Sequence, residues 1–250
     1  MQHTQQSDQP VTAAMLAIGD ELLSGRTRDK NIGHLASVMT LKGIDLNEVR
    51  IVSDTQTAII EALNALRTRY TYVFTSGGIG PTHDDITADA VAAAFDVHID
   101  HDPRAMAILE AHYKEREIEF TTARKRMARI PNGADLIENP VSKAPGFILE
   151  NVHVMAGVPS IFQAMLDRVE PTLKSGIKML SVNIDCPFGE GAIGDALAEV
   201  QKTHRDTSIG SYPKYDGEKY STQIVVRSRD DTALKLAEKA VVVMLQTLSA

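Results

Sequence analysis

The chain has 250 residues, 43% apolar and 24% charged, which is enough for one large globular domain and a smaller one. A formal charge of −7 with no basic stripe argues against nucleic acid as the main partner. The single cysteine, Cys186, excludes an intrachain disulfide, and no apolar run approaches the ~20 residues that span a bilayer. Residues 1–10 are polar and predict a disordered tail rather than a secretory signal. We therefore expect a cytoplasmic protein with no membrane partner.

Strands and helices alternate three times in the first part of the chain. The predicted strands cover 15–18, 49–52 and 72–75, and the helices that follow them cover 29–42, 57–69 and 87–95. This alternation is typical of a layered α/β protein with parallel strands. Ligands bind beyond the carboxyl ends of such strands, so the loops at 19–21, 53–54 and 77–80 should meet at one rim.

The second part of the chain contains a helical stretch, a hairpin and a change of pattern. We expect helices within 103–129, a hairpin of strands 146–149 and 152–155, and a strand-to-helix passage at 155–159 that adds to the same rim. After it, a β-α-β-β-α unit is predicted, with strands 179–184, 208–212 and 222–227 and helices 192–202 and 232–248. The predicted domains are therefore 11–174 and 175–250.

A glycine-rich loop follows the third predicted strand. Glycines 77, 78 and 80 let the main chain approach a ligand closely and direct its N–H groups inward, and the next helix adds a partly positive N-terminus. The loop therefore predicts a phosphate site rather than a simple tight turn. The expected contacts are Ser76, Gly77, Gly78, Gly80, Pro81 and Thr82, with Gly19, Gly157 and Pro159 from the neighbouring loops.

Acidic residues flank this loop. Asp84 and Asp85 would repel a bare phosphate, so their presence favours a divalent cation between them and a pyrophosphate. They could also be helix N-terminal acids, but adjacent acids cannot both cap the same N–H. Asp20 and Glu21 should reach the same rim as metal or ribose contacts. Asp54, considered alone, predicts an N-cap for the helix that follows it.

Other patterns have competing interpretations. The Gly-x-Gly-x-x-Gly run at 189–194 predicts a helix entry, because too few residues follow it to complete a dinucleotide-binding unit. The run 98–102 contains metal-ligand residue types, but Asp102-Pro103 favours a helix start. Arg26, His83 and Lys143 stay open as further phosphate partners. Tyr212, Tyr215 and Tyr220 could stack on a flavin or adenine ring, but we favour a role in covering the sheet of the small domain.

Several motifs, in order, resemble one family over about residues 11–170. They are Gly19-Asp20-Glu21 with Asp29 and Asn31, the loop 77–82 with Asp84, Asp85 and Thr87, Asn139-Pro140, the run 144–147, and Gly157-Val158-Pro159. The chain resembles the molybdopterin-binding-fold proteins, in particular the N-terminal domain of competence- and damage-inducible protein A. The segment around 209–213 resembles part of a domain fused to eukaryotic FAD synthases.

The resemblance implies a three-layer α/β/α sandwich with a mostly parallel sheet and a homo-oligomer, while the β-α-β-β-α pattern predicts a small C-terminal α+β domain. Related enzymes adenylylate molybdopterin with magnesium, and their essential acids match Asp54 and Asp85. Other members resemble hydrolases that cut the pyrophosphate of FAD or ADP-ribose with Mg²⁺, Mn²⁺ or Co²⁺. We expect such a metal-dependent pyrophosphatase, with Asp54 and Asp85 as catalytic acids and Asp20, Glu21, Asp84 and Asp85 as metal ligands. A molybdopterin adenylyltransferase and a non-catalytic binding module for a nucleotide or pterin phosphate are the alternatives.

Overall fold

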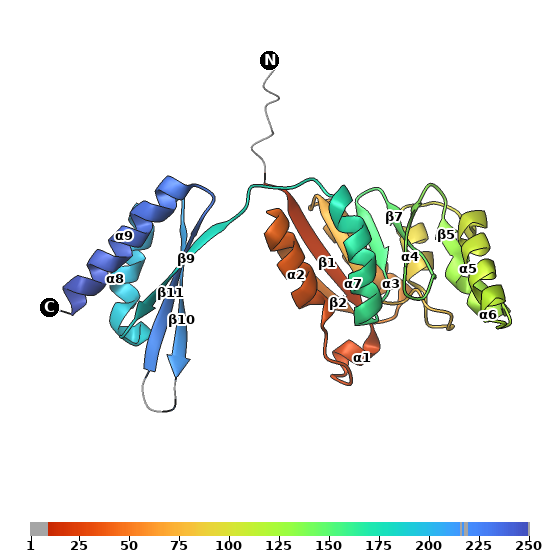
Figure 1. Ribbon diagram of the computed structural model, residues 1–250, viewed down its shortest axis with the longest axis horizontal. Coiled ribbons are helices and arrows are strands. Elements are labelled where there is room, and N and C mark those ends of the chain that lie inside the picture. Colours follow the sequence, from red (N-terminus) through yellow and green to blue (C-terminus); the bar gives the residue numbers. More distant parts are fainter. Residues whose placement is uncertain (1–9, 216, 218–219, 250) are drawn as a thin grey trace, which may run out of the picture. The chain divides into compact units, whose positions relative to one another are not determined.

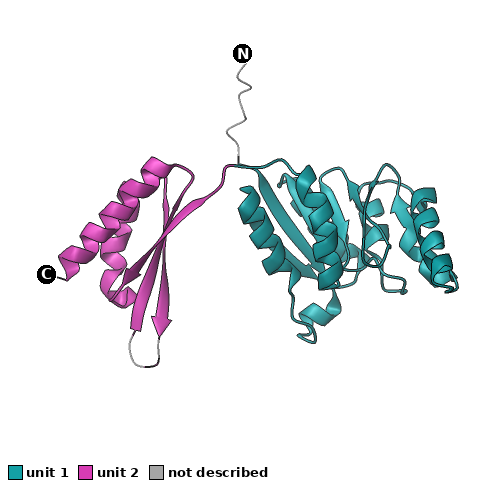
Figure 2. Cartoon of the chain, viewed as in Figure 1, with its two compact units in different colours: residues 1–176 teal, residues 177–250 magenta. Residues whose placement is uncertain are grey.

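A computed structural model describes residues 10–215, 217 and 220–249 of the chain. The predicted tail, 1–10, therefore lies outside the described residues except for Pro10. The chain divides into two compact units, residues 1–176 and 177–250 (Figure 2). Within the described ranges, no helix combines the length and the apolar character needed to cross a membrane.

The first unit is built on a six-stranded sheet with the order β2-β1-β3-β8-β7-β6 (Figure 1). Strands β2, β1, β3 and β8 run parallel, while β7 and β6 are antiparallel to their neighbours. The sheet is therefore mostly parallel, as predicted. Its strands are β1 (Thr12–Ile18), β2 (Asp45–Val52), β3 (Tyr72–Ser76), β6 (Asp135–Ile137), β7 (Gly146–Leu149) and β8 (Val152–Met155).

Helices cover both faces of this sheet (Figure 1). On one face lie α2 (Asn31–Lys42) and α7 (Pro159–Val169), and on the other α3 (Gln56–Arg67), α4 (Thr87–Ala94) and α5 (Pro103–Glu115). Strand β1 serves both cores, because Met15 packs toward α2 and α7 while Leu16 packs toward α3 and α4. A strand buried on both faces needs apolar residues at every position, which explains its unbroken apolar run. The predicted three-layer α/β/α sandwich is confirmed.

Some local elements differ from the sequence prediction. The segment after Gly19, predicted as a loop, forms the short helix α1 (Asp20–Leu23). Strand β4 (Ile99–His101) was not predicted and pairs with β5 (Arg129–Pro131). The stretch 103–129 contains α5, the short helix α6 (Thr122–Lys125) and the 3₁₀ turn η1 (Arg126–Ala128), and a second 3₁₀ turn, η2 (Glu170–Thr172), follows α7.

The run 98–102 leads into a helix. The carboxylate of Asp102 accepts hydrogen bonds from the N–H groups of Arg104 and Ala105, and Pro103 occupies the first helical position. An Asp cap followed by Pro is a common helix start, which confirms the prediction of a helix at this point.

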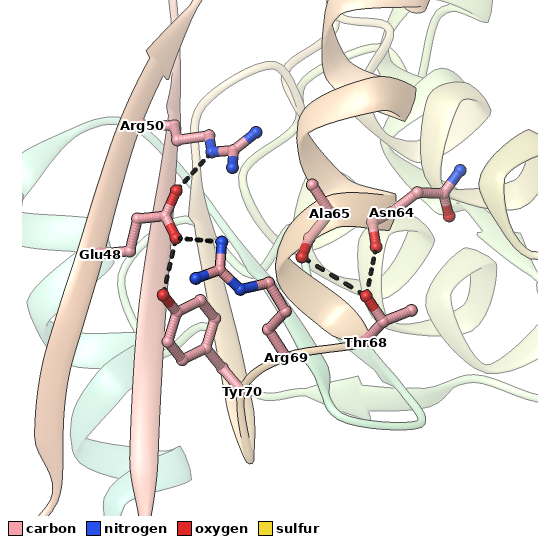
Figure 3. A network of polar contacts seen from close by, with 7 residues as sticks. All are labelled: Glu48, Arg50, Asn64, Ala65, Thr68, Arg69 and Tyr70. Atoms are coloured by element: carbon pink, nitrogen blue, oxygen red, sulfur yellow. Dashed lines mark hydrogen bonds and ion pairs between the residues drawn. The ribbon is translucent and has the colours of Figure 1, made fainter.

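A polar network fixes edge strand β2 to the turn after α3 (Figure 3). Glu48 accepts hydrogen bonds from the Tyr70 hydroxyl at 2.6 Å and from Arg50 Nε at 2.7 Å, and Arg69 lies 3.4 Å away. The Tyr70 bond is the main cause of a lowered pKa at Glu48. At the end of α3, the Thr68 hydroxyl donates to the carbonyl of Asn64.

The second unit is a small α+β domain, as predicted. Its strands form an antiparallel sheet, β10-β11-β9, whose one face packs against both helices. The elements are β9 (Leu180–Cys186), α8 (Glu190–Thr203), β10 (Ser208–Tyr215), β11 (Tyr220–Ser228) and α9 (Asp231–Leu248). Gly189 is the N-cap of α8. A dinucleotide fingerprint requires parallel βαβ strands, so this glycine run is a helix entry.

The tyrosines of this unit lie outside its core. Tyr215 and Tyr220 stack on each other with ring centroids 4.6 Å apart, and both are exposed. Tyr212 lies against Gly210 of its own strand, where an added Cβ would come within 3.4 Å of the ring. Tyr212 therefore covers part of the sheet, whereas Tyr215 and Tyr220 cover each other.

Candidate functional site

A cleft of about 570 Å³ opens at the carboxyl ends of β1, β3 and β8. Ligands of open α/β sheets bind at this end, where the loops that follow neighbouring strands meet. The residues that line it are Ile18, Glu21, Thr27, Asp54, Gly77, Gly78, Ile79, Gly80, Pro81, Asp84, Asp85, Met127, Asn139, Ser142, Ala144, Ala156, Gly157, Val158, Pro159 and Ile161. The cleft thus gathers segments that lie up to about 140 residues apart in the sequence.

The glycine loop forms one wall of the cleft. Gly77 and Gly78 have φ angles of +110° and +66°, which side-chain-bearing residues rarely adopt. Space is also absent, because a Cβ on Gly77 would lie 2.2 Å from the Ile18 carbonyl oxygen. Bare main chain therefore faces the cleft at these positions, as the sequence predicted.

Thr87, at the start of α4, holds this loop from behind. Its hydroxyl donates to the carbonyl of Gly77 at 3.0 Å, and its N–H donates to the carbonyl of Gly78 at 3.0 Å. Thr87 is fully buried. The two bonds tie the loop conformation to the helix that follows it, so the loop is held in place before any ligand binds.

Asp85 is turned back onto the loop. One of its carboxylate oxygens accepts from the Thr82 N–H at 2.8 Å and from the Thr82 hydroxyl at 2.5 Å. The second oxygen is left for a ligand. The neighbouring Asp84 is exposed, and the Thr82 side chain lowers its pKa, so Asp84 is ionised at neutral pH.

Asp54 does not cap α3, the helix that follows it, as the sequence predicted. The N-cap of α3 is Thr55, which makes no side-chain cap bond. The Asp54 carboxylate instead accepts from the N–H of Asp20, in the first turn of α1, at 2.9 Å. Burial raises the pKa of Asp54, and the hydrogen bond from Asp20 lowers it by less. The charges of Asp20, Glu21 and Asp84 raise the pKa further, so the net shift is upward. A carboxyl with a raised pKa is a better proton acceptor.

Two buried asparagines organise the rim, and the sequence did not identify their roles. Asn139 accepts from the N–H groups of Val141 and Ser142 and donates to the carbonyl of Ala144, which shapes the loop 139–145. Asn31, at the start of α2, donates to Ser76 Oγ and to the carbonyl of Gly157. The partners of Asn139 are local, whereas those of Asn31 lie 45 and 126 residues away, so no signal in the sequence indicates its bonds.

The structure brings most of the predicted site residues together, but not all. The cleft is lined by Glu21, Asp54, Gly77, Gly78, Gly80, Pro81, Asp84, Asp85, Gly157 and Pro159. Four predicted residues, Gly19, Asp20, Ser76 and Thr82, do not line it. Asp20 and Thr82 are exposed and support Asp54 and Asp85, whereas Ser76 is buried beneath the loop. Arg26, His83 and Lys143 are also outside the lining.

The charge of the cleft is one-sided. Glu21, Asp54, Asp84 and Asp85 contribute carboxylates, and among the described residues that line the cleft none is Lys, Arg or His. Carboxylate oxygens suit hard cations such as Mg²⁺ and Mn²⁺. Within the described part of the chain, no three His, Cys, Asp or Glu side chains are arranged to hold a metal by themselves. A cation would therefore bind through one or two of these carboxylates and complete its shell with phosphate oxygens and water, as Mg²⁺ commonly does.

Comparisons with known proteins agree with this architecture. The family model described as probable molybdopterin binding domain matches residues 14–175, and the model described as FAD synthase, middle domain, matches residues 178–249. The chain belongs to the CinA-type molybdopterin-binding-fold family.

Individual relatives are similar in sequence and in structure. A protein of Aeropyrum pernix is 31% identical over 211 residues, covering 81% of this chain and 79% of the relative. A CinA-like protein of Sulfurihydrogenibium sp. is 34% identical over 177 residues, which is 68% of this chain but 42% of the relative. The crystal structure of CinA from Thermoplasma acidophilum, a protein of unknown function, aligns with a TM-score of 0.60 and 30% identity, covering 65% of this chain and 98% of that chain.

Proposed function

We propose that this protein hydrolyses the pyrophosphate bond of a dinucleotide-type substrate, such as FAD or ADP-ribose, with the help of a divalent cation. One observation carries the proposal: the carboxylates of Glu21, Asp54, Asp84 and Asp85 share a cleft with the bare main chain of residues 77–80. Without a cation, these carboxylates would repel a phosphate. With a cation bound to the carboxylates, both the cation and the main-chain N–H groups of the loop would attract a diphosphate.

Each part of the cleft has a role in this proposal. The main-chain N–H groups of residues 78–80 would donate to non-bridging phosphate oxygens, and the N-terminus of α7, which lacks a side-chain cap, adds partial positive charge. Asp84 and the free oxygen of Asp85 would hold the cation, with phosphate oxygens and water completing its shell. When bound, the cation would neutralise charge that develops on the phosphate oxygens.

Asp54 would act on the attacking water. Its raised pKa suits the transfer of a water proton to its carboxylate while the oxygen adds to one phosphorus. The bond between that phosphorus and the bridging oxygen breaks, and the bridging oxygen leaves on the second phosphate. The products are two monophosphates, and the proton passes from Asp54 to solvent. The hydrogen bond from Asp20 holds the Asp54 carboxylate in place.

A second candidate is adenylyl transfer to molybdopterin, which the match to a molybdopterin binding domain favours. The match of residues 178–249 to a domain of FAD synthase favours a flavin nucleotide instead. A binding module without turnover would use the same cleft. We also expect self-association, as the family resemblance implies, and light scattering on the purified protein measures it.

The test is to incubate the purified protein with FAD or ADP-ribose and with Mg²⁺, Mn²⁺ or Co²⁺, and to separate the products by chromatography. We expect AMP with FMN or with ribose 5-phosphate. Asp54→Asn and Asp85→Asn should reduce kcat at least about 100-fold, in the range of a lost general base. Asp100→Asn is the matched control, because the exposed Asp100 accepts a main-chain N–H bond but does not line the cleft.

Other outcomes separate the candidates. Transfer of AMP from ATP to molybdopterin, with no cleavage of FAD or ADP-ribose, would favour the adenylyltransferase. Saturable binding without turnover, unchanged in Asp85→Asn, would favour the binding module. No cleavage of either dinucleotide with any of the three metals refutes the pyrophosphatase.

A further inference from the structure

Asn31 joins three separate segments beneath the cleft. It is the first residue of α2 and is only 3% exposed. Its side-chain amide donates to Ser76 Oγ at 2.7 Å and to the carbonyl of Gly157 at 2.8 Å. Ser76 ends β3, and Gly157 lies in the loop between β8 and α7. One side chain therefore links the start of α2 to the end of β3 and to the loop between β8 and α7, and both of these lead into the lining of the cleft.

The two loops meet directly above this amide. Gly157 packs on Gly77 so closely that an added Cβ would lie 3.2 Å from the Gly77 Cα. The Gly77 N–H also donates to the carbonyl of Met155 at 3.2 Å. Gly77 and Gly157 both line the cleft, whereas Asn31 and Ser76 do not. Asn31 therefore contacts one residue that lines the cleft, Gly157, and the residue that precedes another, Ser76, without lining the cleft itself.

Packing alone does not explain an asparagine side chain at position 31, because part of its amide is buried without a hydrogen bond. Its Oδ1 atom is buried and has no hydrogen-bond partner among the described residues. A buried acceptor without a partner destabilises the folded state. The donor half of the amide is fully used and the acceptor half is not, which indicates that the position is occupied for the two bonds it donates.

We propose that Asn31 is a positioning residue that fixes the spacing between the 77–80 loop and the 157–159 turn. This inference rests on the proposed function, because it assigns to that spacing the alignment of the diphosphate. Two main-chain segments that grip one ligand must be held at the right separation, and a misplacement of about 1 Å can lower a rate about 100-fold. Asn31 contributes through Ser76 and Gly157 and does not touch the substrate.

The chain offers a matched control in Asn151. Its side-chain amide also donates two hydrogen bonds, in this case both to main-chain carbonyls, those of Arg67 and Tyr70 at 2.9 Å. Asn151 immediately precedes β8, so it lies at the opposite end of that strand from Gly157. Asn151→Ala removes the same number of amide-donated hydrogen bonds as Asn31→Ala, but at the end of β8 away from the cleft.

The experiment compares Asn31→Ala, Asn31→Asp and Asn151→Ala with the wild type. Asn31→Asp keeps the shape of the side chain but places a carboxylate oxygen against the Gly157 carbonyl. Thermal unfolding first defines a temperature at which all four proteins are folded. There we measure kcat and KM for ADP-ribose with Mg²⁺, Mn²⁺ or Co²⁺, and amide hydrogen exchange in the absence of ligand.

We expect both Asn31 variants to lose roughly 10- to 100-fold in kcat, with a smaller change in KM, and to exchange amides faster at 77–80 and 157–162. Asn151→Ala should stay within about threefold of the wild-type kcat, a deviation of less than 1 kcal/mol, and should not accelerate exchange in those segments. Wild-type kcat and unchanged exchange in the Asn31 variants would overturn the inference. So would equal losses in Asn31→Ala and Asn151→Ala.

Failure of the proposed function has a different signature. If the wild type binds ADP-ribose with the metal but does not cleave it, the pyrophosphatase fails. The spacing role is then decided by whether the Asn31 variants bind ADP-ribose at least about 10-fold more weakly than Asn151→Ala, a difference of about 1.4 kcal/mol. A wild type that neither binds nor cleaves it overturns both.

Discussion

The N–H of Asp20 donates a 2.9 Å hydrogen bond to the carboxylate of Asp54, across 34 residues of sequence. The neighbouring Gly19 N–H donates to the carbonyl of Val52, so two consecutive N–H groups attach the end of β1 to the end of β2. The same bond places Asp54 beside the charges of Asp20, Glu21 and Asp84. Asp54 is thus held where its ionised form is disfavoured, which does not stabilise the fold and, under the proposed function, suits a proton acceptor.

The first prediction is that Asp54→Asn stabilises the protein at neutral pH. The amide oxygen can still accept the Asp20 N–H, and the repulsion between carboxylates is lost. We expect a gain of a few tenths to about 1 kcal/mol in the free energy of unfolding, the range of partly screened charges. A folded-state pKa above the ordinary 3.8 means that wild-type stability falls as pH rises through that pKa. The gain should therefore shrink as pH falls toward the ordinary value of an aspartate.

Urea unfolding at several pH values measures this difference. Asp100→Asn is the control of opposite sign, because the His101 N–H lowers the pKa of Asp100. Removing the Asp100 charge should not stabilise the protein at neutral pH. A loss of stability in Asp54→Asn at pH 7 would contradict the argument that the acidic cleft opposes folding.

The second prediction concerns Thr87. Thr87→Val keeps the shape of the side chain but removes the hydroxyl that donates to the buried end of the glycine loop at Gly77. We expect a loss of about 1–3 kcal/mol in the free energy of unfolding, the range for an unsatisfied buried acceptor. Thr87→Ser keeps the hydroxyl and should lose less. Denaturant unfolding of both variants measures the effect, and a larger loss in the serine variant would contradict it.

Sequence reasoning predicted the layered fold because apolar runs and loop residues are local signals. The unbroken apolar run of β1 indicates burial on both faces, and the glycines after β3 indicate a close main-chain approach. Strand β4 was missed because it has three residues, two of them polar, and its partner β5 lies about 30 residues away. The alternation of apolar and polar residues that identifies a strand cannot be recognised over only three residues.

The errors at the site have a common physical cause. The sequence predicts Asp54 as the N-cap of α3, because a capping residue is expected directly before its helix. In the structure its carboxylate instead accepts a hydrogen bond from α1. Asp20 was predicted as a metal ligand, but it does not line the cleft and its N–H serves Asp54. Which group a side chain contacts depends on tertiary placement, and the residues that brace the site from below, such as Asn31, are visible only there.

The third prediction is that a divalent cation stabilises the folded protein. Mg²⁺ or Mn²⁺ should raise the Tm of the wild type, and more so with ADP-ribose present, because phosphate oxygens complete the cation's shell. A ligand at 100 times its Kd adds about 2.7 kcal/mol to stability. Asp84→Asn should show a smaller shift, since Asp84 is ionised and exposed in the cleft. Chelation with EDTA should restore the metal-free Tm.

Sodium chloride at matched ionic strength is the control for general screening, and Asp100→Asn is the control variant. A shift in wild type that Asp84→Asn reproduces in full would place the cation elsewhere on the protein. Equal shifts with sodium and magnesium would show screening rather than a site.

The fourth prediction concerns His153, on β8, which lies away from the cleft lining. Its ring packs 5.0 Å from that of Phe74 and is 4% exposed, and its Nδ1 atom is buried without a partner among the described residues. Burial lowers its pKa from 6.5 to about 4. The unfolded chain therefore binds a proton more readily than the folded one, so stability should fall as pH drops from about 6.5 to about 4. The full effect is about 3 kcal/mol.

His153→Leu removes the titrating group and should flatten this part of the stability curve. Absolute stability can change in either direction, because the leucine loses ring contacts with Phe74 and Tyr72 while filling a similar volume. The slope between pH 6.5 and 4 is therefore the quantity to measure, by urea unfolding at fixed ionic strength. If wild type and His153→Leu have equal slopes, the buried imidazole does not govern the acid sensitivity of the first unit.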